Sequence, residues 1–188
     1  TAGHHMESML AAYGSGASRV STETGARILN IDIGGGTTKL ALLEGGRVLA
    51  TAAVHVGGRL MVVDKDGRIG RLDPAGRAHA RRAGFDWKLG DTVDDEQLDK
   101  VADVMAETLM AALRPDMPHD VAHLYLTDPL PDMSGIAGVM ASGGVAGRRI
   151  ELVVYDDGGE ANRSRTLVSR LIDEDKVDII IGGSRSEE

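Results

Sequence analysis

The sequence predicts an α/β fold, and three observations support this prediction. Apolar, β-favouring runs at 28–33, 40–43 and 48–54 are separated by glycine-rich turns, as in a meander of antiparallel strands. Apolar residues then recur every three or four positions over 93–113, which is the spacing of an amphipathic helix. Strand-like and helix-like segments alternate over the remainder of the chain.

Composition narrows the classes of function. The chain has 188 residues, of which 42% are hydrophobic, enough for one domain or two small ones with an aliphatic core. Its net charge of −8 disfavours nucleic-acid binding and attachment to anionic membranes. The absence of cysteine excludes disulfides and thiolate metal ligands. Because no apolar run approaches the ~20 residues of a membrane span and no signal peptide is visible, we expect no membrane association and a cytoplasmic protein.

The first half of the chain is expected to contain two helices and a set of short strands. Gly14-Ser15-Gly16 should end the first helix, and Pro74 suits the first position of the second. The turn at Asp64–Gly67 should join two of the strands. In chain order, the expected elements are a helix over 6–13, a polar linker over 18–25, the meander over 27–56, strands over 59–64 and 68–72, and a helix over 74–83.

In the second half, an acidic first turn before residue 98 suits the start of the helix over 93–113. Phe85 and Trp87 are interpreted as anchors that hold a loop against the core. His119 and His123 are four residues apart, but the preceding Pro118 disfavours a helix there, so we expect no metal site. The elements expected after the helix are strands over 121–126 and 136–141, a small-residue turn at 142–144, a strand over 150–157, a helix over 161–174 and a strand over 177–183.

The stretch 28–43 carries the clearest chemistry, because it reads strand, glycine loop, strand. Gly34, Gly35 and Gly36 lack Cβ atoms, so their backbone can approach an anion closely and adopt positive φ, which would form an anion-binding nest of N–H groups. Asp32 stands at the end of the first strand, where a carboxylate can hold Mg²⁺ or its waters. Thr37 and Thr38 add hydroxyl donors, and Lys39 follows them. The P-loop pattern GxxxxGK[ST] is absent. A glycine-rich hairpin with a solvated Asp32 is the alternative interpretation.

Three short motifs carry a resemblance to a known superfamily. DIGGGTT at 32–38 resembles the second phosphate motif of the actin, sugar-kinase and heat-shock-chaperone ATPases. HVGGR at 55–59 resembles the glycine pair that follows the third strand in those chaperones, and VMASGGV at 139–145 resembles the adenosine motif. Longer stretches, among them LATAAVHVGGRL, GRIGRLDPAGRAHA and LGDTVDDEQLDKVADVMAETL, are similar to one family, the ethanolamine ammonia-lyase reactivating factors. This resemblance covers residues 1–146.

The resemblance implies that 1–146 form a ribonuclease-H-like, actin-like ATPase second lobe that binds ATP and magnesium. It implies a chaperone-like role, in which ATP drives the release of damaged cobalamin from ethanolamine ammonia-lyase, the expected partner. No phosphate motif of a first lobe occurs in the chain, so we expect half a nucleotide site, little ATP hydrolysis, and an exposed surface that favours a homodimer. Asp32 would hold the metal. The implied nucleotide-binding residues are Asp32, Gly34, Gly35, Gly36, Thr37, Thr38, Lys39, Gly57, Gly58, Ser142, Gly143 and Gly144.

Residues 147–188 form a separate segment, predicted as a βαβ unit of different origin. The stretch IELVVYDDGGEANRSRTLVSRLIDEDKVDIIIGG is similar to a segment of branched-chain amino-acid periplasmic binding proteins, in which Ser184 matches a serine beside the ligand. Two alternative functions follow. One is a small-ligand module that binds branched-chain amino acids, and the other is a kinase or ATPase from elsewhere in the actin superfamily.

Overall fold

The computed structural model describes residues 3–114, 119–131, 133–145 and 148–149. They belong to one compact unit, Thr1–Ile150. The predicted βαβ segment, with Ser184, lies outside the described residues apart from Arg148 and Arg149. No helix in the described ranges is both long and apolar enough to cross a membrane.

The described strands form one mixed sheet and one small hairpin. The sheet has the order β3-β2-β1-β6-β7, and β4 and β5 pair separately. β1 and β2 are antiparallel, as are β2 and β3, whereas β1 and β6 are parallel. The sheet is therefore mixed, and together with the helices it gives the predicted α/β fold. The predicted antiparallel meander is β1, β2 and β3. The strands are β1 (Arg27–Ile33), β2 (Thr38–Glu44), β3 (Arg47–Val54), β4 (Met61–Val63), β5 (Ile69–Leu72), β6 (Ile136–Val145) and β7 (Arg148–Arg149).

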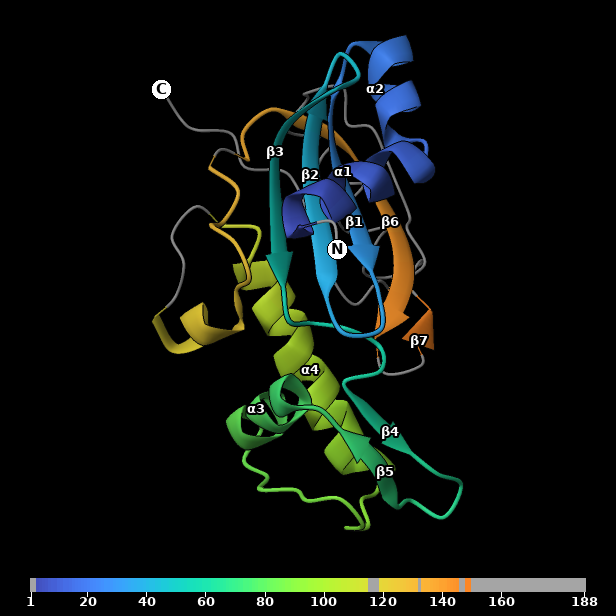
Figure 1. Cartoon of the computed structure of the whole chain (residues 1–188), viewed down its shortest axis with the longest axis vertical. Helices are drawn as coiled ribbons and strands as arrows, with labels where there is room; N and C mark the ends of the chain where they lie inside the picture. Colours follow the sequence, from blue (N-terminus) through green and yellow to red (C-terminus); the bar gives the residue numbers. More distant parts are fainter. Residues whose placement is uncertain (1–2, 115–118, 132, 146–147, 150–188) are drawn as a thin grey trace, which may run out of the picture. The chain divides into compact units, whose positions relative to one another are not determined.

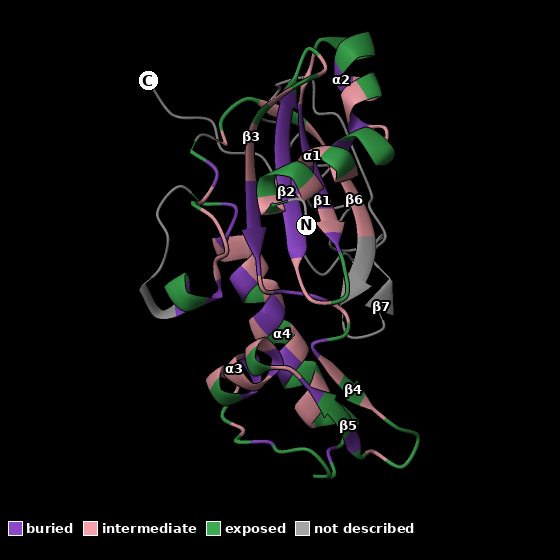
Figure 2. Cartoon of the chain, viewed as in Figure 1, coloured by how far each residue is buried: buried purple, intermediate pink, exposed green. Residues whose placement is uncertain are grey.

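The turn between β2 and β3 shows how local sequence creates the meander. Gly45 and Gly46 have φ of 53° and 81°, so both central residues are left-handed, as a two-residue type I′ turn requires. Its twist matches that of the flanking strands, and Glu44 pairs with Arg47 across it. The result is a tight hairpin with β2 in the interior, and Figure 2 shows β2 buried along nearly all of its length.

Alternation along the strands divides their side chains between two packed faces. Leu29, Ile31 and Leu40 point to one face and join a core with Val101 and Met105 of helix α4 (Asp95–Ala111). The opposite face carries a smaller cluster that includes Ile28, Ala41 and Leu43 and is covered by helices α1 (His4–Gly14) and α2 (Ala17–Thr24). Figure 1 shows α1 crossing in front of β1, β2 and β3.

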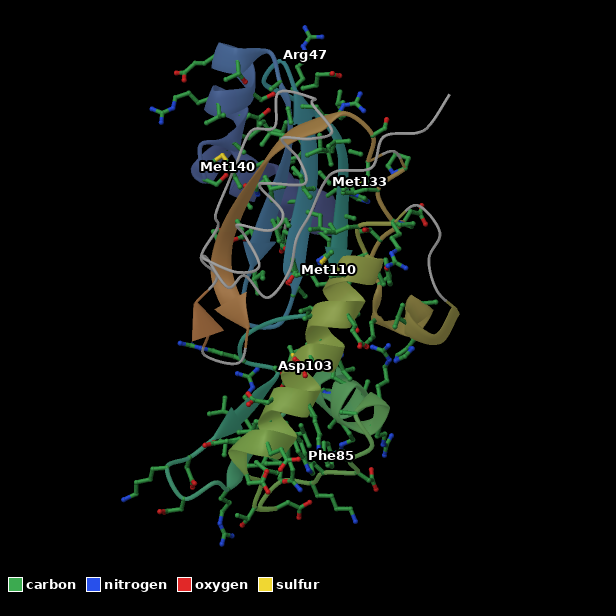
Figure 3. The ribbon with its side chains drawn as sticks, turned by 180° about the vertical axis from the view of Figure 1, so that it is seen from behind. Arg47, Phe85, Asp103, Met110, Met133 and Met140 are labelled. Atoms are coloured by element: carbon green, nitrogen blue, oxygen red, sulfur yellow. The ribbon has the colours of Figure 1, made fainter. Side chains whose placement is uncertain are left out.

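The segment between β3 and β6 extends the core away from the sheet. Helix α3 (Pro74–Arg82) begins at Pro74, as predicted, and α4 begins with a capping box between Asp94 and Gln97. Phe85 and Trp87 stack with ring centroids 5.0 Å apart, and Trp87 is buried, which confirms their role as loop anchors. Figure 3 shows Phe85 in the part of this segment that lies away from the sheet, and Met110 where α4 reaches the sheet.

Three expectations about secondary structure are wrong. Residues 18–24 are not a linker but belong to α2, because Ala17 and Ser21 are buried against the sheet. Gly16 and Gly25, both with positive φ, lie at the two ends of this helix. Residues 119–124 form a 3-10 helix, η1 (His119–Leu124), rather than a strand. Only the end of that expected strand pairs, through a bridge between Tyr125 and Val54.

The third error concerns the end of β6. The expected small-residue turn at 142–144 does not form, because β6 continues through Val145 and residues 142–143 pair with Asp32 and Ile33 of β1. Gly144 then pairs with Arg149 of β7. Glycine weakens a strand, but here pairing with the backbones of β1 and β7 stabilises the extended conformation.

Candidate functional site: the glycine loop between β1 and β2

Residues 34–37 form the loop that joins β1 to β2. The Gly34 N–H donates to the Thr37 carbonyl oxygen at 2.9 Å and closes the loop on itself. The N–H groups of Gly35, Gly36 and Thr37 donate no hydrogen bond to any described residue. Gly34 and Gly35 are exposed, and Gly36 and Thr37 are partly exposed. Within the described part of the chain, three backbone donors are therefore without an acceptor and can serve an external one.

The reason for glycine in this loop differs from the expected one. None of Gly34, Gly35 and Gly36 has positive φ, so the predicted left-handed nest is not formed. Close approach is the actual requirement. A Cβ on Gly34 would lie 3.1 Å from the Thr37 carbonyl oxygen, whereas a Cβ on Gly36 would meet no atom within 4 Å in the described part of the chain. The space beside Gly36 is open to a ligand.

The second glycine pair supports the loop from behind. Gly58 N–H donates to the Gly34 carbonyl oxygen at 3.0 Å, and Arg59 N–H donates to the Gly35 carbonyl oxygen at 2.7 Å. A Cβ on Gly57 would lie 2.6 Å from that same Gly35 oxygen. The structure thus brings both predicted glycine motifs together, with the second one holding the shape of the first.

Thr37 and Thr38 have different environments. Thr38 is fully buried, and its hydroxyl donates to the Val56 carbonyl oxygen at 2.8 Å. The expected use of Thr38 as a ligand donor is corrected by this contact, because its hydroxyl proton is already bound within the protein. The Thr37 hydroxyl has no partner among the described residues, so it remains a candidate donor at the loop.

Asp32 and Ser142 connect two of the predicted motifs, the glycine loop and the end of β6. They are register partners in the parallel pair of β1 and β6. The Ser142 hydroxyl donates to Oδ1 of Asp32 at 2.8 Å. The second carboxylate oxygen of Asp32 has no partner in the described residues. Gly143 and Gly144 continue the strand beyond this contact.

Lys39 points toward α1 and not toward a ligand at the loop. It is only 7% exposed, and its Nζ lies 2.7 Å from Oε2 of Glu7 and 2.9 Å from Nδ1 of His4. Hydrogen bonding and charge attraction from Lys39 lower the pKa of Glu7. The structure therefore assigns the Lys39 ammonium to an ion pair with α1, a contact that no pattern near Lys39 could indicate.

Arg59 is a further candidate residue, which the residues predicted for the site did not include. Its side chain is exposed and makes no ion pair with a described residue, and its Cβ lies 3.7 Å from the position a Cβ would take on Gly35. The Cγ and Cδ atoms of Arg59 also lie within 4.0 Å of that position, so the stem of this cation runs along the loop. A guanidinium and backbone N–H groups that have no partner among the described residues are donors of the kind that phosphate and carboxylate groups bind. The signal was present in the sequence, because Arg59 follows the glycine pair directly.

The donor set also bears on magnesium. No group of three or more His, Cys, Asp or Glu side chains within the described ranges is arranged to hold a metal ion. Mg²⁺ usually keeps several waters and uses one or two carboxylates together with phosphate oxygens. Asp32, with one uncommitted oxygen next to the loop, fits that pattern of coordination.

Comparison of the sequence with known proteins places this chain in a family. The family model described as "Ethanolamine utilisation protein EutA" matches residues 1–162, a range that includes the predicted junction at 146–147. Ethanolamine ammonia-lyase reactivase EutA of Salmonella typhimurium (strain LT2) is 36% identical over 127 residues, which are 61% of this chain and 26% of that protein. The protein of the same name from Escherichia coli (strain K12) is 48% identical over 69 residues, 37% of this chain and 15% of that protein.

The chain spans about a quarter or less of the length of these curated relatives. The family match nevertheless extends over most of the chain, and it covers the glycine loop, the glycine pair and β6. The chain therefore belongs to the EutA family of ethanolamine utilisation proteins.

Proposed function

We propose that this chain carries one side of the Mg–ATP site of a reactivating factor for ethanolamine ammonia-lyase. The observation that carries the proposal is the glycine loop, with three N–H groups that have no partner among the described residues and an exposed arginine beside it. Phosphate groups bind to such arrays of backbone donors and guanidinium groups. The donors of this loop fit the phosphates of the nucleotide.

The sheet supports the assignment to a ribonuclease-H-like, actin-like lobe. An antiparallel meander of β1, β2 and β3 is followed by β6, which returns to lie parallel beside β1. This arrangement puts the glycine loop and residue 142 of β6 at the same end of the sheet, where the two predicted nucleotide motifs can act on one ligand. The lobe assignment rests on this topology together with the motif order.

The biological role is inferred from the relatives. Both bear the name ethanolamine ammonia-lyase reactivase. We propose that this chain takes part in the same task, contributes to ATP-driven release of damaged cobalamin, and contacts the lyase. A cytoplasmic location fits that role. Because phosphoryl transfer needs groups positioned on both sides of the nucleotide, we expect binding of Mg–ATP with little hydrolysis.

Calorimetric titration with Mg–ATP tests the proposal. The wild-type chain should bind, and Asp32→Ala and Arg59→Gln should each weaken binding, because they remove a metal ligand and a phosphate contact. Asp99→Ala is a matched control, since Asp99 is an exposed carboxylate on α4. If Asp32→Ala and Arg59→Gln bind as tightly as the wild type, the glycine loop is not a phosphate site.

Two further expectations have their own measurements. Self-association as a homodimer is tested by light scattering, where a monodisperse monomer would count against it. A branched-chain amino-acid module is not favoured by the family match and is tested by thermal shift with leucine, isoleucine and valine. Binding of these amino acids without any response to Mg–ATP would replace the proposed function with this alternative.

A further inference from the structure

Three side chains stand in a row across the sheet beside the glycine loop. Asp32 is the register partner of Lys39 on β2 and of Ser142 on β6. Register partners project from the same face of a sheet, with Cβ atoms ~5 Å apart in an antiparallel pair. The Asp32 carboxylate therefore has two competing neighbours, a cation on one side and a hydroxyl on the other.

The hydroxyl, and not the cation, holds the carboxylate. Ser142 donates to Asp32 Oδ1 at 2.8 Å, whereas the Lys39 ammonium is bound to Glu7 at 2.7 Å and to His4 at 2.9 Å. Asp32 has no ion pair in the described part of the chain. Glu7 belongs to α1, which covers this face of the sheet, and the Glu7 carboxylate therefore contacts Lys39 from the helix that packs on the strands.

We infer that Glu7 and Ser142 are positioning residues that keep the Asp32 carboxylate available to a divalent cation. Glu7 holds Lys39 away from Asp32, and Ser142 fixes the orientation of the carboxylate while leaving Oδ2 uncommitted. The inference rests on the proposed Mg–ATP function and adds to it a means by which the metal ligand is kept unpaired.

The charges explain why such an arrangement is needed. A lysine bound to Asp32 would supply the positive charge that a divalent cation would otherwise supply, and the two would compete for the same oxygens. A neutral hydroxyl orients the carboxylate without cancelling its charge. Glu7 replaces Asp32 as the partner of Lys39, so the buried ammonium stays paired and the sheet does not contain an isolated charge.

The first test requires no ligand. We make a double-mutant cycle with Lys39→Met and Asp32→Asn, once in the wild-type chain and once in the Glu7→Gln chain. Thermal unfolding of each set gives the coupling free energy between positions 39 and 32. The coupling should be near zero in the wild-type background and should appear in the Glu7→Gln background, where Lys39 can reach Asp32. Equal coupling in both backgrounds would overturn the inference.

The second test measures the metal directly. Mn²⁺, which shares the oxygen-ligand preference of Mg²⁺, is titrated alone by calorimetry. Glu7→Gln should weaken Mn²⁺ binding about fivefold, because Lys39 would then compete with the metal for Asp32, and Lys39→Met in the same chain should restore it. Ser142→Ala should weaken binding and Ser142→Thr should retain it. Glu23→Gln is the control, an exposed carboxylate of α2.

The outcomes separate the inference from the proposed function. Mn²⁺ binding that responds to these variants, in a chain that does not bind ATP, would support the inference and contradict the nucleotide assignment. ATP binding that depends on Asp32, with Mn²⁺ affinity unchanged by Glu7→Gln and Ser142→Ala, would support the function and overturn the inference. A wild-type chain that binds no Mn²⁺ would also overturn it.

Discussion

Gly57 lies against the peptide of Gly35, so closely that a Cβ on Gly57 would be 2.6 Å from the Gly35 carbonyl oxygen. The two residues come from different predicted motifs, separated by β2 and β3. Backbone-to-backbone packing of this kind leaves no room for any side chain. The second glycine pair therefore has a structural purpose, which is to support the loop that we propose as the phosphate site.

We expect Gly57→Ala to lower the free energy of unfolding by about 1–3 kcal/mol, because the backbone must move to admit a methyl group. Gly36→Ala is the matched control and should change stability by no more than about 0.5 kcal/mol, since a Cβ there meets open space. Urea unfolding measures both. Equal losses in the two variants would contradict the packing account of Gly57.

Thr38→Val should destabilise the chain by about 1–3 kcal/mol. The substitution preserves shape but leaves the Val56 carbonyl oxygen without the hydroxyl that donates to it inside the protein. Thr38→Ser keeps the hydroxyl and should recover much of the loss. Thermal unfolding of the three chains checks the prediction, and a Thr38→Val variant as stable as the wild type would show that this hydrogen bond contributes nothing.

His79 should make stability depend on pH. The residue is fully buried, its Nε2 is 2.7 Å from the His55 carbonyl oxygen, and burial lowers its pKa below the ordinary value of 6.5. The unfolded chain therefore binds more protons than the folded chain between the lowered pKa and 6.5, so stability rises with pH in that window. The stability that depends on neutral His79 is fully present above pH 6.5, and it is lost as the pH falls from 6.5 through the lowered pKa.

Unfolding of the wild type, His79→Gln and His5→Gln at pH values from 5 to 8 tests this expectation. His79→Gln should lose part of the pH dependence, whereas His5→Gln, an exposed position, should keep it. If His79→Gln shows the same pH dependence as the wild type, the buried ring is not its source.

Asp94→Ala should destabilise α4 by about 1 kcal/mol. The Asp94 carboxylate accepts from the Gln97 N–H at 2.8 Å, and the Gln97 side chain accepts from the Asp94 N–H at 3.3 Å, so the substitution removes half of the capping box. Asp99→Ala removes an exposed acid from the same helix without touching the cap. Circular dichroism during thermal unfolding compares the two, and equal effects would argue against the cap.

The elements that local chemistry determines were predictable. The type I′ turn at Gly45-Gly46, the Pro74 start of α3 and the acidic start of α4 each depend on residues a few positions apart. The glycine loop was predictable for the same reason. The conformation of the loop was not predictable, because glycine permits both positive φ and close packing of backbones. Here the loop has no positive φ, and Gly57 packs closely against it.

Elements that depend on distant partners were missed. The segment 18–25 was predicted to be a polar linker, but residues 18–24 belong to α2 because Ala17 and Ser21 are buried against the sheet. The small residues at 142–144 were predicted to form a turn, and they form strand because residues 142 and 143 pair with β1 and Gly144 pairs with β7. Propensity is a weak guide in both places, since tertiary contacts outweigh it.

By itself, the sequence determined the family, the antiparallel meander and the presence of a glycine loop after a strand that carries Asp32 near its end. Only the tertiary structure decided which groups that loop has to offer: it buried the hydroxyl of Thr38, bound Lys39 to Glu7 and brought Ser142 to Asp32 across 110 positions of chain. The physical reason is that turn and strand preferences act between neighbours, whereas hydrogen bonds and ion pairs are chosen by whichever partner the packed sheet and helices place within reach.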